Sequence, residues 1–272
     1  MLKGFFSNQV ALGCAQAALT SLLALAVTLL ARSRAIHLER ETVVALLRGI
    51  IQITAVGSVL VLLLQGPAWT SVFLLAAMMV AAAKMSAGRA KGLPGGFQTS
   101  LYAITAGAGS VIALMTWAGV IDTRITSLVP IGSMLIANAM NTNSLVLNRF
   151  RAEVESHTGL IETGLALGAE SRETVRPYVQ VSVQSSMIPA IDSLRSLGIV
   201  WIPGLMAGML LSGAKPVYAA IYQFVTISMI LSSSGLTALL CSLLIRRSVF
   251  SPAEQLTLRA RSSVTIASRS RA

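Results

Sequence analysis

Most of this sequence consists of long apolar runs separated by short polar connections. A helix needs about 20 residues to cross a bilayer, and several of the runs reach that length. Charged residues make up only 11% of the chain, against about 25% in a soluble domain. The sequence therefore predicts an all-α integral membrane protein with about seven transmembrane helices. The predicted spans are Val10–Leu30, Val43–Leu64, Ser71–Ala87, Gln98–Val120, Leu128–Leu147, Arg195–Leu211 and Val217–Ile245.

Positive charge alternates between the connections on the two sides of these spans. Cytoplasmic loops of membrane proteins carry an excess of Lys and Arg. The connections after the first, third and fifth spans and the tail are rich in these residues, whereas the opposite connections hold only Lys3, Arg124 and Lys215. This pattern places the N-terminus outside and the C-terminus in the cytoplasm. The net charge of +11 then reflects topology and contact with anionic membrane lipid rather than nucleic-acid binding.

The chain divides into a membrane domain and a short tail. We predict a transmembrane permease domain over residues 1–250, within which residues 148–180 form a cytoplasmic segment. Ser251, Pro252 and Glu254 have the pattern of a capped helix start with proline at the first helical position. We therefore expect a short cytoplasmic helix, followed by a disordered basic end, within residues 251–272.

No catalytic signature is present. The sequence lacks HExxH, GxSxG and a pair of intramembrane aspartates, and the serine run Ser232–Gly235 has no histidine in any span to activate it. Small hydroxyl side chains in such a run are typical of helix packing. A phosphate-binding GxxxxGK[ST] loop is also missing. We predict that the chain is not an enzyme, holds no cofactor or fixed metal, and depends on another chain for any ATP-driven work.

Charged and amide side chains inside the apolar runs are candidates for a substrate path, because polar groups are costly in hydrocarbon. Arg48 and Gln52 share one face near the cytoplasmic end of the second span, where Arg48 could instead extend to the lipid headgroups. Asp192 lies three residues before Arg195 at the entry to the sixth span. The two could form an intrahelical ion pair or line the mouth of a path.

The fifth span carries the densest group of such residues. Asn138 and Asn141 share a face, Met134 lies one turn earlier, and Met140 and Asn143 are close by. Amide oxygens and thioethers could loosely coordinate a passing cation. Hydrogen bonds between helices and ordinary methionine packing explain the same residues. Both interpretations stay open at this point.

Proline and glycine gather around the sixth span. Gly204 and Gly208 form a GxxxG pattern that permits close helix approach. Pro189 and Pro203 precede and enter this region, which predicts a bend or a seam between subunits. The stretch Tyr178–Leu194 is too polar for deep hydrocarbon, and we expect an interfacial helix there.

The stretch Asn148–Pro189 is the one long polar interval of the chain. The apolar positions Phe150, Val154, His157, Ile161 and Leu165 recur every three or four residues, which predicts an amphipathic helix. Gly168 interrupts the pattern, and Ser171 offers an N-cap for a second helix. A helix, a glycine turn and a helix on the cytoplasmic side indicate a docking platform.

The sequence ETGLALGA at residues 162–169 resembles the cytoplasmic EAA-type loop of ABC-transporter permeases, in which a glutamate precedes a glycine by six positions. Other motifs follow the same order along the chain as in one group of permeases. They are RGIIQ at 48–52, PIGSM at 130–134, NAM at 138–140, LGA at 167–169, IPAID at 188–192 and PGLMAG at 203–208. Together they resemble the FetB-type permease family, which includes bacterial iron exporters and plant aluminium-tolerance relatives.

This resemblance implies a multi-pass permease of the cytoplasmic (inner) membrane that works as a homodimer with two FetA-type ATP-binding subunits. Those partner subunits would bind ATP and Mg, and a short coupling helix of the permease would enter a groove on them. The implied coupling residues are Glu162, Thr163, Gly164, Leu165, Leu167, Gly168, Ala169 and Arg172.

The expected function is export of iron or another metal ion from the cytosol. The expected path is lined by Met134, Asn138, Asn141 and Asp192, with Met140, Arg48 and Gln52 as further candidates. Export of a sugar nucleotide or another small solute is the alternative substrate. An ATP-independent channel or a structural membrane subunit is the alternative class.

Overall fold

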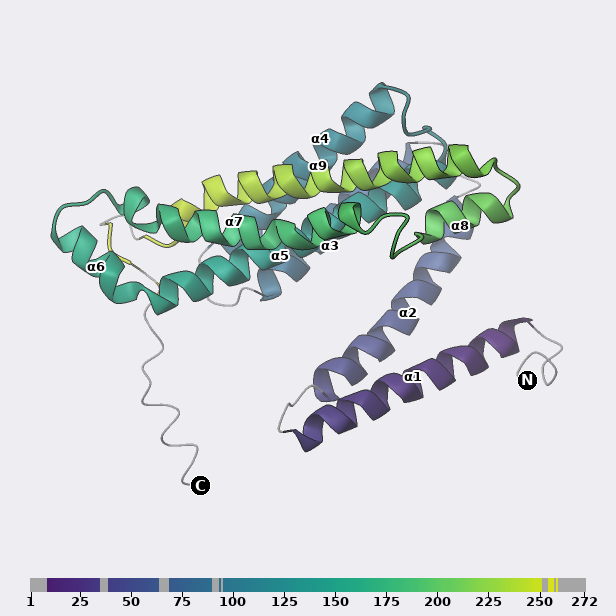
Figure 1. Ribbon diagram of the computed structural model, residues 1–272, viewed down its shortest axis with the longest axis horizontal. Helices are drawn as coiled ribbons and strands as arrows, with labels where there is room; N and C mark the ends of the chain where they lie inside the picture. Colours follow the sequence, from purple (N-terminus) through teal and green to yellow (C-terminus); the bar gives the residue numbers. More distant parts are fainter. Residues whose placement is uncertain are drawn as a thin grey trace. The chain divides into compact units, whose positions relative to one another are not determined.

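The computed structural model describes residues 9–34, 39–63, 69–89, 93, 95–250, 254–256 and 258. Regular structure in this part of the chain is all helical, which confirms the predicted all-α class (Figure 1). The chain forms two compact units, Met1–Gly66 and Pro67–Ala272. The predicted tail helix lies almost wholly outside the described residues.

The first unit is a hairpin of two long apolar helices, α1 (Gln9–Ser33) and α2 (Glu39–Leu63). An ion pair of 3.4 Å between Arg32 Nε and Glu39 Oε1 joins the end of α1 to the start of α2. The apolar side chains are largely exposed, for example Leu23 at 67% and Ile53 at 70%. Such surfaces are expected of helices that face lipid or other membrane helices.

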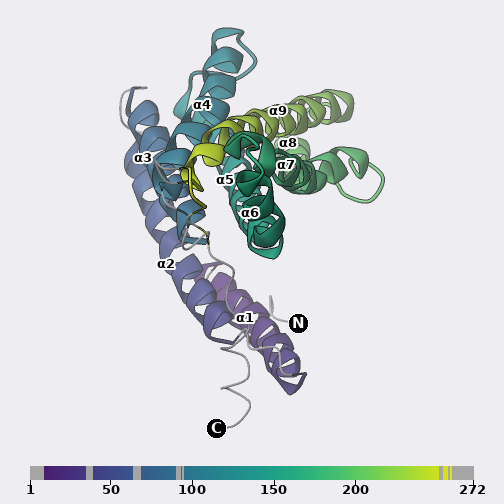
Figure 2. The ribbon, with the colours of Figure 1, turned by 90° about the vertical axis from the view of Figure 1, so that its left-hand side faces the viewer.

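The second unit is a helical bundle built around α5 and α9. α5 packs against α3, α4, α7 and α9, while α9 also contacts α4, α7 and α8 (Figure 2). The helices of this unit are α3 (Thr70–Arg89), α4 (Gly96–Trp117), α5 (Ile125–Ser156), α6 (Thr158–Ala166), α7 (Ser171–Arg195), α8 (Gly204–Leu211) and α9 (Pro216–Ser248).

Two apolar clusters form the core of this bundle. One is centred on Ile104, Leu135 and Ile227, where α4, α5 and α9 meet. The other contains Phe150 and Ile245 and continues into α6 and the first turns of α7. The second cluster therefore anchors the polar interval of the sequence to the bundle.

Five of the described helices are long and apolar enough to cross a membrane, namely α1, α2, α3, α4 and α9. They match five of the predicted spans and support an integral membrane protein. α5 and α7 have comparable lengths of 32 and 25 residues but contain more polar side chains. Part of this lower hydropathy is offset by burial, because Asn143 and Ser182 are buried and hydrogen-bonded to a neighbouring helix or to their own backbone.

The predicted sixth span, Arg195–Leu211, is wrong. The long helix of this region is α7, which ends at Arg195, and residues 196–203 form a turn before the short α8. The predicted interfacial helix at Tyr178–Leu194 is also wrong as a separate element, because it is part of α7. Hydropathy missed this helix because its buried face uses serine: Ser182 Oγ donates to Tyr178 O at 2.6 Å, and Ser186 Oγ to Val183 O at 2.8 Å.

Candidate functional site

The polar interval folds as an elbow of three helices at one end of the second unit. α5 continues beyond the predicted span end at Leu147 and ends at Ser156. The helix is interrupted at His157, and α6 begins at the next residue. A turn with Gly168 at φ 86° then leads into α7. The predicted single amphipathic stripe is thus shared by two helices. The predicted N-cap Ser171 is the first residue of α7, and Glu170 occupies the cap position.

One face of α6 is fixed to the bundle. Ile161 is 1% exposed and belongs to the apolar cluster that also contains Val154 and Val175. Gly164 lies against α7, where an added Cβ would come within 3.1 Å of Thr174 Cγ2. The Ala169 N–H donates to Gly164 O at 3.0 Å and closes the turn. α6 therefore has a defined position between α5 and α7.

The other face of α6 is open. Leu160 is 68% exposed and Leu167 is 84% exposed. Among the predicted coupling residues, Gly164 and Leu165 are half-buried, and the remaining ones are exposed: Glu162, Thr163, Leu167, Gly168, Ala169 and Arg172. This face therefore presents two exposed leucines and the Glu162 carboxylate to the surroundings.

A cleft of about 680 Å³ lies between the elbow and residues 254–256, which follow α9. Carboxylates line it on both sides, with Glu162 and Glu170 from the elbow and Glu254 opposite. Leu256 contributes an apolar wall and packs against the same cluster as Ile161. The cleft is therefore a negatively charged hollow on a chain of net charge +11.

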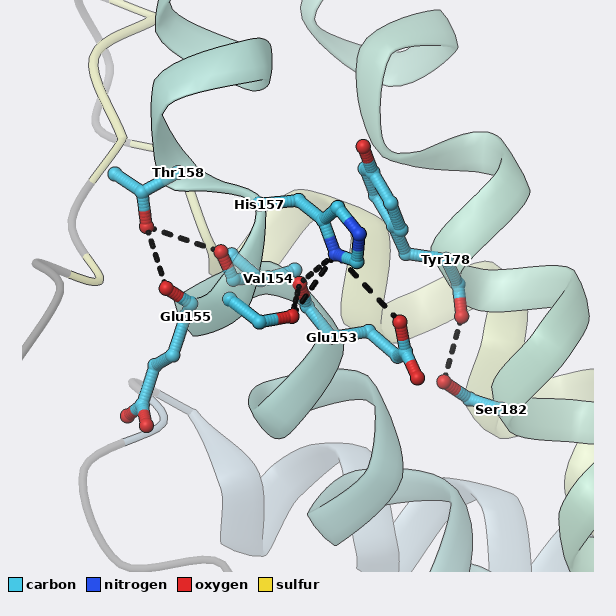
Figure 3. A network of polar contacts seen from close by, with 8 residues as sticks. Glu153, Val154, Glu155, His157, Thr158, Tyr178 and Ser182 are labelled. Atoms are coloured by element: carbon cyan, nitrogen blue, oxygen red, sulfur yellow. Dashed lines mark hydrogen bonds and ion pairs between the residues drawn. The ribbon is translucent and has the colours of Figure 1, made fainter.

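A polar network surrounds the joint between α5 and α6 (Figure 3). The His157 ring stacks on the Tyr178 ring of α7, with centroids 4.7 Å apart and an interplanar angle of 24°. His157 Nδ1 lies 2.9 Å from both Glu153 O and Ser156 Oγ. This contact between α5 and α7 has no signal in the sequence, where His157 appears only as one position of a helical stripe.

The predicted path residues of the fifth span lie on α5. Met134 and Asn138 are half-buried, and Asn138 Nδ2 donates to Met134 O at 2.9 Å. Asn141 is exposed on the same side of the helix. Met140 packs against the apolar core together with Met134. By helical spacing, Met134, Asn138 and Asn141 share one side of α5, and Met134 contacts the apolar core as Met140 does.

The remaining path candidates are dispersed. Asp192 is exposed near the end of α7, and its Oδ1 lies 3.9 Å from Arg195 Nη1, which is the predicted intrahelical pair. Arg48 and Gln52 are exposed on α2, in the first unit. Within the described residues, no group of three or more His, Cys, Asp or Glu side chains could hold a metal ion.

Asn143 joins three helices. It is fully buried, and its Nδ2 donates to Ser86 Oγ of α3 at 2.7 Å and to Ser100 Oγ of α4 at 2.9 Å. Ser144 Oγ adds a hydrogen bond of 3.1 Å to Ser86 Oγ. Of the two interpretations of the polar residues of this span, hydrogen bonding between helices therefore holds for Asn143. The serines of α3 and α4 were missed because single serines in apolar runs give no pattern.

The predicted hinge residues lie within α7, within α8 or at the start of α8. Pro189 is exposed within α7, and Pro203 occupies the N-cap of α8. Apart from their chain neighbours and the backbone of α8 itself, no described atom lies within 4 Å of a Cβ built on Gly204 or Gly208, so their GxxxG pattern forms no close contact with another described helix. α8 is held instead by the buried Gln223 of α9, whose Oε1 accepts from Met206 N at 3.1 Å.

Comparison with known proteins finds relatives of similar length. The chain is 30% identical to the UPF0014 membrane protein STAR2 of Oryza sativa over 88% of its own length and 84% of the relative. It is 29% identical to the probable iron export permease protein FetB of Escherichia coli, covering 89% and 93%. The protein ALUMINUM SENSITIVE 3 of Arabidopsis thaliana is 28% identical, with 90% of both chains covered. No solved structure matches.

These relatives confirm the resemblance that the motifs indicated, since they include both the bacterial permease and the plant proteins. The model of the Uncharacterised protein family (UPF0014) matches residues 14–250. A match over this much of the sequence covers every described helix of the bundle. The chain therefore belongs to the UPF0014 family of membrane proteins.

Proposed function

We propose that this protein is the permease subunit of an ABC exporter, in which α6 receives the movement of a separate ATP-binding subunit. The observation that carries this proposal is the way in which α6 is attached to the bundle. Its inner face is anchored by the buried Ile161, and its outer face exposes Leu160, Glu162 and Leu167. A short helix fixed between two long helices can pass a push or pull on its exposed face to the bundle.

In this proposal, the ATP-binding subunit holds ATP and Mg and closes when ATP binds. Its movement displaces α6, and α5 and α7 tilt with it because both flank α6. Two permeases and two ATP-binding subunits form the working complex. The exposed Gly204 and Gly208 of α8 are available for a seam between the permeases, with Pro203 and Pro189 as bending points.

The proposed topology has seven spans, with the N-terminus outside and α6 in the cytoplasm. α5 and α7 complete the set begun by the five apolar helices. The distribution of Arg and Lys supports this orientation, since Arg149, Arg151, Arg172 and Arg176 surround the elbow. The cytoplasmic (inner) membrane is the proposed location.

The proposed substrate is iron or another metal ion, moved out of the cytosol. The name of the Escherichia coli relative as a probable iron export permease supports this choice. The face formed by Met134, Asn138 and Asn141 offers thioether and amide groups for brief contacts with a passing ion. Asp192 would add a carboxylate near the end of α7.

A sugar nucleotide or another small polar solute is the second candidate. The observation that favours it is the chemistry of the same face, where Asn138 and Asn141 are neutral hydrogen-bonding groups. The alternative class is an ATP-independent channel or a structural subunit. Such a protein would use the same face of α5 and would not need α6 to bind an ATP-binding subunit.

Co-purification with the ATP-binding subunit tests the proposal. The tagged permease should retain the ATP-binding subunit in detergent, and replacement of both Leu160 and Leu167 by Glu should release it while the permease stays folded. Replacement of the exposed Trp117 and Ala118 at the end of α4 by Glu adds the same two charges outside α6 and α8, and this control should leave the complex intact. Retention of the partner by the double α6 variant would contradict the proposal.

A further inference from the structure

His157 is the residue at which α5 ends and α6 begins. Its backbone N–H donates to Glu153 O at 3.1 Å and to Val154 O at 3.3 Å, which closes α5. Its carbonyl accepts from Ile161 N at 3.1 Å, which starts α6. Its φ of −114° and ψ of 19° leave the helical range, so the direction of the chain changes at this residue.

The ring of His157 is held in one orientation on Tyr178. The two rings stack at 4.7 Å, and Nδ1 meets Glu153 O and Ser156 Oγ on the α5 side. Glu153 Oε2 lies 3.6 Å from the same nitrogen. The imidazole is therefore attached to α5 at its edge and to α7 through its face (Figure 3).

Tyr178 belongs to a well-packed part of α7. Val175 and Val179 on the same helix are 0% and 1% exposed, and both belong to the cluster that contains Ile245 of α9. Tyr178 itself packs against this cluster. A displacement of the His157 ring therefore acts on a helix that is packed against α9.

The elbow has a second attachment at the other end of α6. There a Cβ added at Gly164 would come within 3.1 Å of Thr174 Cγ2, so α6 lies close to α7, and the Gly168 turn connects the two helices. A helix attached at one end can swing about that end, whereas a helix attached at both ends moves its neighbour with it. The Gly168 turn holds the C-terminal end of α6, and the His157–Tyr178 stack holds its N-terminal end.

We propose that His157 and Tyr178 are a positioning pair that makes the movement of α6 carry α7. This inference rests on the proposed function and assigns residues outside the exposed coupling face. Without the stack, α6 would still bind the ATP-binding subunit but would rotate at His157 instead of tilting α7. ATP hydrolysis would then continue while transport declined.

The test is the number of substrate molecules moved per ATP hydrolysed in vesicles that carry both subunits, with Fe²⁺ and a sugar nucleotide as the probes. Tyr178→Leu should lower this ratio roughly two- to tenfold, the range that an aromatic pair contributes, while the ATP-binding subunit stays bound. Tyr178→Phe keeps the ring and should restore the ratio. Tyr102→Leu, which removes an exposed tyrosine on α4, is the matched control and should leave the ratio unchanged.

If Tyr178→Leu does not fold, the same ratio can be measured in variants of His157. His157→Leu should lower the ratio, and His157→Phe, which keeps a flat ring at this position, should retain most of it. A normal ratio in either leucine variant would overturn the positioning role while leaving the proposed function intact. A wild-type complex that moves neither these probes nor any of a panel of other metal ions in response to ATP would instead contradict the proposed function, and the positioning role with it.

Discussion

A Cβ atom added at Gly107 of α4 would lie 2.7 Å from the backbone nitrogen of Thr237 in α9 and 2.2 Å from its Oγ1. The two helices therefore cross with backbone against backbone at this point. α4 and α9 form the most extensive helix pair of the second unit. Small residues permit such approach in membranes, where close packing rather than water exclusion holds helices together.

Replacement of Gly107 by alanine should therefore push α4 away from α9. We expect a loss of about 1–3 kcal/mol in the free energy of unfolding, the usual cost of overpacking. Unfolding in detergent, followed by helical circular dichroism, measures this change. Gly109→Ala is the matched control on the same helix, since its nearest neighbour is the flexible end of Met79 at 3.5 Å. Equal stability of the two variants would contradict the close crossing.

Asn143→Ala should separate the helices that its amide joins. The substitution removes donors to Ser86 and Ser100, and we expect a loss of about 1 kcal/mol, typical of a hydrogen bond between membrane helices. Asn148→Ala changes an exposed asparagine of the same helix and should have little effect. The same unfolding experiment compares them, and a silent Asn143→Ala variant would argue against the three-helix junction.

Gly168→Val should uncouple the elbow from the partner subunit. Its φ of 86° is a conformation that β-branched residues rarely adopt, and the strain costs about 1–3 kcal/mol. We expect weaker co-purification of the ATP-binding subunit and reduced ATP-dependent transport. Gly119→Val places the same side chain in open space at a φ of 73° in the turn after α4, away from α6, and is the control for backbone strain. Unchanged assembly and transport in Gly168→Val would show that the coupling assignment is wrong.

Replacement of both Met134 and Asn138 by alanine should impair the substrate path. If the substrate is iron, cells that express this variant should retain more iron than cells that express the wild type, because export is slower. Total cellular iron at matched membrane expression is the measurement. Asn148→Ala again serves as the control. Unchanged iron at normal expression would count against a metal path along this face of α5.

The apolar helices could be predicted from the sequence because apolar side chains predominate on all of their faces. α7 could not, since its buried face mixes Val175 and Val179 with Ser182 and Ser186. Hydropathy averages over such a helix and shifts the predicted span toward the apolar residues after Arg195. The serines become compatible with the bundle only through hydrogen bonds to their own helix.

The position of the elbow could be predicted from the spacing of its apolar residues and from Gly168. The interruption between α5 and α6 could not be predicted. The apolar stripe continues through His157, so periodicity alone predicts one helix across the break. The break is stabilised by a stack with Tyr178, which is distant in the sequence. In the same way, nothing in the sequence distinguishes Gly107 from the other glycines, because its role depends on the position of Thr237.

The central claim is that ATP hydrolysed by a partner drives export through this permease. The direct measurement is transport into inside-out vesicles that carry both subunits, with a panel of metal ions and a sugar nucleotide offered outside. We expect accumulation of a metal ion, iron foremost, that requires hydrolysable ATP and is lost when the ATP-binding subunit is omitted. Accumulation of the sugar nucleotide instead would change the substrate and keep the mechanism. Movement that is equal with and without ATP, or no movement of any probe, would contradict the account.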